Sequence, residues 1–188
     1  MHPPPPDQVD LGEVLLRAPS HEDAEALFTA TSRDLGHLGP WMAWATPEAN
    51  TLEARAAFID ECRAKTTAGQ EAHYLVVDPA DGRVLGACGL HDRISDEGIE
   101  IGYWLASAAI GHGLMTRIPA TLTDVALACE DITRVEVHCD AANAPSNGVP
   151  RRLGFTLERV EDTEVTALAE SGRTQIWVRT DPVGLEPG

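Results

Sequence analysis

The sequence lacks long apolar runs, a basic leader and paired cysteines. No stretch approaches the roughly 20 apolar residues that a helix needs to span a bilayer. The chain begins with a proline-rich segment, not with a basic stretch followed by an apolar one. Its four cysteines form no C-x-x-C pair, which argues against a zinc knuckle or a disulfide framework. We expect an unsecreted, cytoplasmic protein with reduced structural thiols and no metal.

Basic residues are also scarce. The chain has 14 Lys and Arg against 30 Asp and Glu, a formal net charge of −16. Such a surface repels phosphate backbones and anionic lipid and attracts cationic partners, so we expect no nucleic-acid and no membrane partner. Two interpretations of the acidity stay open: solubility alone, or electrostatic steering of an amine or a basic protein.

The length of 188 residues suits one substantial core and is short for two. Prolines fix φ and remove hydrogen-bond donors, so residues 1–10 are predicted to be a disordered or extended lead. Residues 11–181 are predicted to form a single domain, followed by a tail at 182–188.

Strand and helix patterns alternate along the chain. A glycine inside the third strand of the predicted meander, Gly102, indicates a bulge or a close backbone approach. Apolar residues recur on one face of the stretch after residue 113, which predicts an amphipathic helix. Strands are predicted at 14–17, 74–77, 84–90, 99–105, 134–139, 154–157 and 175–179, and helices from about 20 to 33, within 47–68, at 114–127 and at 145–153. This pattern predicts a mixed α/β (α+β) fold, with antiparallel strands first, a β-α-β-α-β stretch later and no internal repeat.

A glycine-rich turn precedes the predicted helix at 114–127. A strand that ends in glycines and runs into a helix leaves unpaired backbone N–H groups at the positive end of the helix dipole, where a phosphate binds. The donors would come from Ile110, Gly111, His112, Gly113 and Leu114. An ordinary strand-to-helix turn explains the same residues, and the dinucleotide fingerprint is not met because its third glycine is missing.

Four motifs carry a family resemblance: EIGYWL at 100–105, GHGLMT at 111–116, NAPS at 143–146 and RLGF at 152–155. In order and spacing they resemble the RimJ/RimL-type branch of the GNAT acetyltransferases, which acetylate N-terminal amines of ribosomal proteins and, in relatives, small amines. The similarity covers about residues 11–179. It implies the GNAT fold, a central mostly antiparallel sheet split beside a coenzyme A-binding β-α-β-α-β half.

The sequence departs from the family pattern at two positions. Ala108 stands where the pyrophosphate loop usually begins with Gln or Arg, and Arg117 replaces a common glutamate. The first change implies weaker coenzyme binding, not its loss, because backbone amides make the main contacts. The second adds a positive charge near the phosphates or merely faces solvent.

The resemblance implies acetyl-CoA as the cosubstrate and direct attack of a neutral amine on the thioester, without an acyl-enzyme. A backbone N–H around Gly102 to Trp104 would hold the thioester oxygen. The residues implied in binding the coenzyme are Tyr103, Trp104, Leu105, Ile110, Gly111, His112, Gly113, Leu114, Met115 and Asn143.

Three residues are candidates for proton transfer. Glu100 is the candidate general base, acting through an ordered water, or is simply an exposed strand residue. Glu164 is the nearest match by count to a second glutamate used in this branch. Ser146 would donate to the departing thiolate and Asn143 would bind the pantetheine amide, although both residue types also cap helices. Cys139 is interpreted as a core thiol.

Three aromatic or imidazole side chains are candidates for the acceptor site. Trp41 and Trp44 lie where relatives place the acceptor-site helix, and either wall the amine pocket, stack on a cation or belong to the core. His91, at a strand end, either faces the cleft or is structural.

Three functions stay open on the sequence. The chain acetylates the N-terminal amine of a protein, such as a ribosomal protein, or acetylates a small amine or antibiotic, or binds acyl-CoA or a partner without catalysis. A homodimer is expected by analogy only. The sequence names neither the acceptor nor the acyl chain length.

Overall fold

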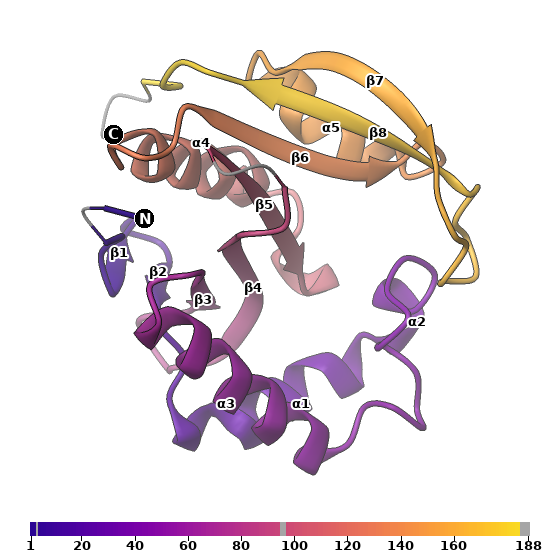
Figure 1. The fold of residues 1–188 in the computed structure, drawn as a ribbon. Coiled ribbons are helices and arrows are strands. Elements are labelled where there is room, and N and C mark those ends of the chain that lie inside the picture. The colour runs from indigo at the N-terminus through magenta and orange to yellow at the C-terminus, as the bar shows by residue number, and fades with distance from the viewer. Residues whose placement is uncertain (3, 95–96, 185–188) are drawn as a thin grey trace.

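The computed structural model describes residues 1–2, 4–94 and 97–184. Within these residues, eight strands form one sheet in the order β1-β2-β3-β4-β5-β6-β8-β7 (Figure 1). Neighbouring strands are antiparallel except for β5 and β6, which run parallel. Among the described helices, none is long and apolar enough to cross a bilayer. The expected mixed fold with a mostly antiparallel sheet is confirmed.

The first half of the chain builds one side of the sheet and two covering helices. The Ser20 N–H and hydroxyl both donate to Asp23, which fixes the 3-10 turn at His21–Asp23 that leads into α1. Thr51 caps α3 by accepting from the Ala54 amide. The elements are β1 (Gln8–Asp10), β2 (Leu15–Arg17), α1 (Ala24–Arg33), α2 (Leu35–Leu38), α3 (Leu52–Thr67), β3 (Ala72–Val77), β4 (Val84–His91) and β5 (Gly98–Leu105).

The second half supplies the two helices beside the β5–β6 junction. A 3-10 turn at Ser107–Ala109 leads from β5 through the glycine turn into α4. The elements are α4 (Leu114–Leu127), β6 (Arg134–Asp140), α5 (Ala144–Arg152), β7 (Thr156–Asp162) and β8 (Arg173–Arg179). The bounds of the predicted elements lie close to those observed, and α3 falls inside the predicted range 47–68. The strand β7 is longer than predicted, and β1 and α2 were not predicted.

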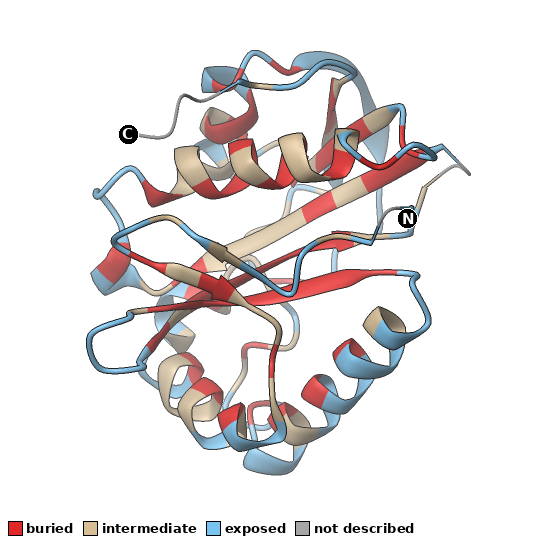
Figure 2. Ribbon diagram, turned by 90° about the vertical axis from the view of Figure 1, so that its left-hand side faces the viewer, coloured by how far each residue is buried: buried red, intermediate tan, exposed pale blue. Residues whose placement is uncertain are grey.

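Two apolar cores lie on opposite faces of the sheet. Side chains alternate along a strand, so Tyr74 and Val76 of β3 join the core under α4, whereas Leu75 and Val77 join the core with Leu27 of α1 and Ile59 of α3. Figure 2 shows helices on both sides of the sheet, with the exposed surface of the lower helices turned away from it. The larger core, under α4 and α5, extends across the β5–β6 junction and holds both halves together.

The sheet splits between β5 and β6. Their ladder contains three residue pairs, from Gly98–Arg134 to Glu100–Glu136, whereas β4 and β5 pair along their length, from His91–Glu100 to Gly86–Leu105. Residues 101–105 of β5 therefore have a partner strand on the β4 side, and their β6-facing edge is open. Figure 1 shows the two strands diverging beyond their paired ends.

Two local predictions offered alternatives that the structure separates. The lead is extended in part: residues 8–10 form β1, and the Met1 amino group lies 3.1 Å from the Asp131 carboxylate. At Gly102 there is a close approach and no bulge. The glycine is needed because the His91 ring packs on it, and a Cβ there would lie 2.8 Å from the imidazole Nε2. Residues 3 and 185–188 of the predicted lead and tail lie outside the described residues.

Candidate functional site

A cavity of about 630 Å³ lies at the split between β5 and β6. Tyr103 and Leu105, with residues of α4 and α5, line it from the sheet face that carries the larger core. Trp104 lines it from the opposite face, because its side chain alternates with those of its strand neighbours, and Trp41 of the segment after α2 lines it too. The cavity thus joins the two faces of the sheet at the place where the strands separate.

The glycine turn forms one wall of this cavity. Gly111 and Gly113 have φ of +92° and +75°, and a Cβ built on either would meet no atom within 4 Å. In the part of the chain that the structure describes, the Gly111, His112 and Gly113 amides donate to no protein group. Gly113 is also the N-cap of α4, so these amides stand with the first-turn amides of Leu114 and Met115 at the positive end of the helix. This geometry fits a bound phosphate group.

The charge of the cavity is opposite to that of the whole molecule. Among the described residues that line it there is no Asp or Glu, although the chain carries 30 of them. Arg152, from the last turn of α5, is the one Arg or Lys in that lining, and His37 is the one histidine. An anionic ligand therefore meets a cation and free amides, and no carboxylate repels it.

A proline in α5 creates the contact that spans the split. Pro150 has no N–H, so the Ser146 carbonyl four residues earlier has no helical donor. The Tyr103 hydroxyl of β5 donates to this carbonyl at 3.2 Å. Burial raises the pKa of Tyr103, so its hydroxyl stays protonated at neutral pH. The bond connects β5 to α5 beside the cavity.

Ser146 and Asn143 have different roles in α5. The Asn143 side chain accepts from the Ser146 amide at 3.2 Å and so caps the helix. The Ser146 hydroxyl lies instead 3.1 Å from the Cys139 sulfur. Burial raises the pKa of Cys139 to about 11, so the residue is a neutral thiol, in line with its interpretation as a core residue and not a nucleophile. Asn143 and Ser146 both line the cavity.

Glu100 lies on the other face of the sheet, at the last paired position before the split. Its carboxylate is 3.8 Å from His138 and 3.9 Å from Arg93, and its side chain is 14% exposed. His138 in turn lies 2.5 Å from the Glu136 carboxylate. These side chains form a polar group on this face of the sheet, and none of them is among the residues that line the cavity.

The structure brings most of the predicted coenzyme residues together and separates some others. Of the ten, all but His112, which is exposed, line the cavity. Trp41 lines it too, whereas Trp44 packs against Trp104, with ring centroids 6.0 Å apart, and beneath the Arg55 guanidinium. Glu164 is exposed in the loop between β7 and β8 and does not line the cavity.

His91 also lies away from the cavity lining, in a buried cluster with Glu71 and His73. Two further residues were not predicted from the sequence to belong to the site. Arg152 is one of two arginines in the last turn of α5, and only the structure shows that it lines the cavity whereas Arg151 lies over the Trp177 ring. His138 was detectable only from the alternation of β6, which places it on the same face as Glu136.

Comparisons with known proteins identify the family. The family model described as an acetyltransferase (GNAT) domain matches residues 13–156. A Bacillus subtilis (strain 168) protein named "Putative ribosomal N-acetyltransferase YdaF" is 29% identical over 149 residues, which cover 77% of this chain and 79% of that protein.

Solved structures show the same fold. Mycobacterium smegmatis RimJ, in complex with CoA-disulfide, superposes with a TM-score of 0.82 at 24% identity over 96% of this chain and 90% of its own. The microcin C7 self-immunity acetyltransferase MccE, in complex with acetyl-CoA and AMP, gives a TM-score of 0.83 at 22% identity, covering 94% and 97%. Because these sequence identities are low, the two similarities show a shared fold and nothing about function.

Proposed function

The chain belongs to the GNAT acetyltransferase family, and on this premise we propose that it acetylates the N-terminal amine of a polypeptide, using acetyl-CoA. The observation that carries the proposal is the cavity that joins the two sheet faces at the β5–β6 split. The acyl donor and the amine can then enter from opposite faces and meet at one place, which removes much of the entropic cost of a two-substrate reaction.

The residues of the cavity fit acetyl-CoA. Open amides at Gly111 to Gly113 and the N-terminus of α4 would hold the pyrophosphate, and Arg152 would add a positive charge. Asn143 would face the pantetheine arm from the start of α5. When bound, acetyl-CoA supplies a thioester whose carbonyl carbon is the electrophile. The β6-facing edge of residues 101–105 offers backbone donors for the developing negative charge on oxygen.

The acceptor amine must lose a proton on the opposite face. We assign this role to Glu100, which precedes the split and is only partly exposed. His138, 3.8 Å from Glu100 and hydrogen-bonded to Glu136, offers a next site for the proton. Because the amine enters beside Trp41 and Trp104, their rings would form the walls along its path.

The leaving sulfur needs a proton on the α5 side. Ser146 is our candidate donor, because its hydroxyl is not used for capping and contacts a neutral thiol. Tyr103 would position Ser146 through the bond to its carbonyl.

Two findings favour a polypeptide over a small amine. The B. subtilis relative is named for ribosomal N-acetylation. A second, more open hollow of about 860 Å³ lies between the segment from Leu35 to Pro47 and residues 165–168, where Leu168 is 94% exposed. This hollow offers apolar surface for residues that follow the acetylated one. A ribosomal acceptor would place the protein in the cytoplasm.

An acceptor screen with labelled acetyl-CoA tests the proposal. Peptides with free N-termini should be turned over with kcat/KM at least tenfold above that of small primary amines, and N-terminally blocked peptides should be inert. Preference for small amines would overturn the acceptor assignment. Release of free thiol without any acetylated acceptor would leave only the family assignment.

A further inference from the structure

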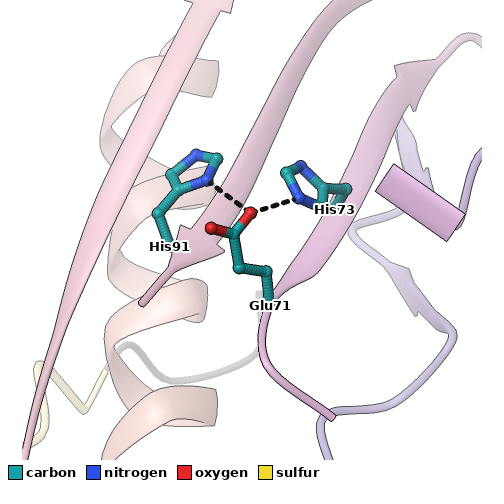
Figure 3. A group of neighbouring side chains, drawn as sticks. All are labelled: Glu71, His73 and His91. Atoms are coloured by element: carbon teal, nitrogen blue, oxygen red, sulfur yellow. Dashed lines mark hydrogen bonds and ion pairs between the residues drawn. The ribbon is translucent and has the colours of Figure 1, made fainter. Parts of the chain in front are cut away.

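Three potential metal ligands from two neighbouring strands meet in a buried cluster outside the proposed active site. Figure 3 shows Glu71, which precedes β3, between His73 of β3 and His91 at the end of β4. One carboxylate oxygen, Oε2, lies 2.7 Å from the His73 Nε2 and 3.4 Å from the His91 Nδ1. The three ligand atoms all lie within 4.8 Å of one another. One ion can therefore contact all three groups.

The strand register explains why these side chains converge. His73 pairs with Gly89 across the β3–β4 ladder, so His91 lies diagonally across from it and on the same face. The two imidazole rings are 5.0 Å apart between centroids. Gly102 on the next strand has no side chain, which leaves room for the His91 ring. The backbone thus fixes both imidazoles before any ion binds.

The chemistry of the three groups suits a transition-metal ion. Two imidazoles and one carboxylate are typical ligands of zinc. The three side chains are between 5% and 12% exposed, so the site lies inside the protein and not on its surface.

Two cations surround the cluster and have opposite effects on an ion. Lys65 contacts the other carboxylate oxygen, Oε1, at 3.4 Å, so it orients Glu71 and leaves Oε2 available. Arg93 lies 3.4 Å from the His91 Nδ1 and competes for the same lone pair. Because Arg93 is half exposed and also lies near Glu100, it can turn away toward that carboxylate.

We propose that Glu71, His73 and His91 bind a divalent transition-metal ion, with Zn²⁺ as the fitting ion. Bonds of about 2.0 to 2.2 Å require shifts on the order of 1 Å in the side chains and movement of the His73 proton to Nδ1. Three protein ligands leave a fourth position for water. The ion would join the ends of β3 and β4 next to the strand that carries Glu100, and this inference does not depend on the identity of the acceptor.

Binding of Zn²⁺ to the full-length protein tests the site. Titration against a competing chelator should show one equivalent of bound Zn²⁺, and Co²⁺ should give a visible absorption band typical of low coordination number. Glu71→Gln and His73→Gln should each weaken Zn²⁺ binding at least tenfold. The matched control is His21→Gln, which removes an exposed histidine that is paired with Asp60 and should leave affinity unchanged.

A second variant separates metal binding from a purely hydrogen-bonded cluster. Arg93→Gln removes the competing cation and should tighten Zn²⁺ binding roughly two- to fivefold, the range expected for one partly exposed charge. If the cluster variants fail to fold, imidazole NMR of the unaltered protein decides: two of the seven histidines should shift on Zn²⁺ addition. Absence of any such shift, or equal Zn²⁺ affinity in Glu71→Gln and the unaltered protein, would overturn the proposal.

Discussion

The two edges of β5 have different neighbours and different roles. Toward β4 the strand is paired from Glu100 to Leu105, and side chains of this ladder enter both apolar cores. Toward β6 the ladder stops after three pairs. The first edge stabilises the fold, and the second exposes backbone and side chains to a cavity. A parallel pair that ends early thus opens part of the sheet to a cavity, and no non-glycine residue that the structure describes has a positive φ.

The largest effect is expected from Gly113→Val, at the glycine turn that lines the cavity. A β-branched residue at φ +75° is strained and would cover the amides of the turn, so we expect coenzyme A affinity to fall more than 100-fold, as measured by calorimetry. The matched control is Gly82→Val in the β3–β4 turn, which has the same φ and equally open surroundings. It should lose similar stability and retain coenzyme affinity. Equal affinity in both folded variants would remove the turn from the binding site.

The second-largest effect is expected at Ser146 of α5, which lines the cavity beside the β6-facing edge of β5. Ser146→Ala should lower kcat roughly 10- to 100-fold with little change in KM for acetyl-CoA, because the lost group acts in the chemical step. Asn143→Ala is the comparison, since Asn143 caps the helix: it should lose about 1 kcal/mol of stability. A Ser146→Ala protein that is destabilised but has near wild-type kcat would assign Ser146 to structure alone.

A substitution at Asp23, which does not line the cavity, should change stability and not coenzyme binding. The Asp23 carboxylate accepts hydrogen bonds from two guanidinium nitrogens of Arg17, at 2.6 and 2.7 Å. It also accepts one from the Ser20 N–H and one from the Ser20 hydroxyl. Burial opposes its ionisation, but these bonds lower its pKa below the usual 3.8. Its contribution is therefore complete above pH 3.8 and is lost as pH falls through the lower folded-state value.

Asp23→Asn should cost about 1 to 3 kcal/mol near neutral pH and leave coenzyme affinity unchanged. The difference in unfolding free energy between variant and wild type should shrink below pH 3.8. Chemical denaturation at several pH values measures both effects. A difference that is constant from pH 7 to pH 2 would show that the ionised carboxylate is not what stabilises this turn.

The smallest effect expected is that of salt. The chain is strongly acidic, whereas the cavity lining lacks carboxylates, so a cationic acceptor is attracted by the surface and the coenzyme is held locally. Screening over about 8 to 10 Å should lower kcat/KM for a cationic acceptor several-fold as ionic strength rises. Coenzyme affinity should change less in proportion. An acceptor kcat/KM that does not depend on salt would make the acidity a solubility feature only.

Local patterns in the sequence predicted most of the elements. The 114–127 helix follows from its apolar spacing and its preceding glycines, and its observed bounds are the same. The glycine turn was predicted either to bind an anion or to be an ordinary strand-to-helix turn, and the positive φ of Gly111 and Gly113 was seen only in the structure. The family assignment likewise rested on motifs whose order is visible in the sequence.

Packing across the sheet decided the rest. Whether Trp44 reaches the cavity and whether His91 joins Glu71 depend on contacts between residues distant in the chain. Sequence patterns report the preferences of short segments, so they determined the elements and the glycine turn before α4. The strand register, and the point at which β5 and β6 separate, arise only when the segments pack together. The positions of the cavity, the Tyr103–Ser146 contact and the histidine cluster depend on this packing.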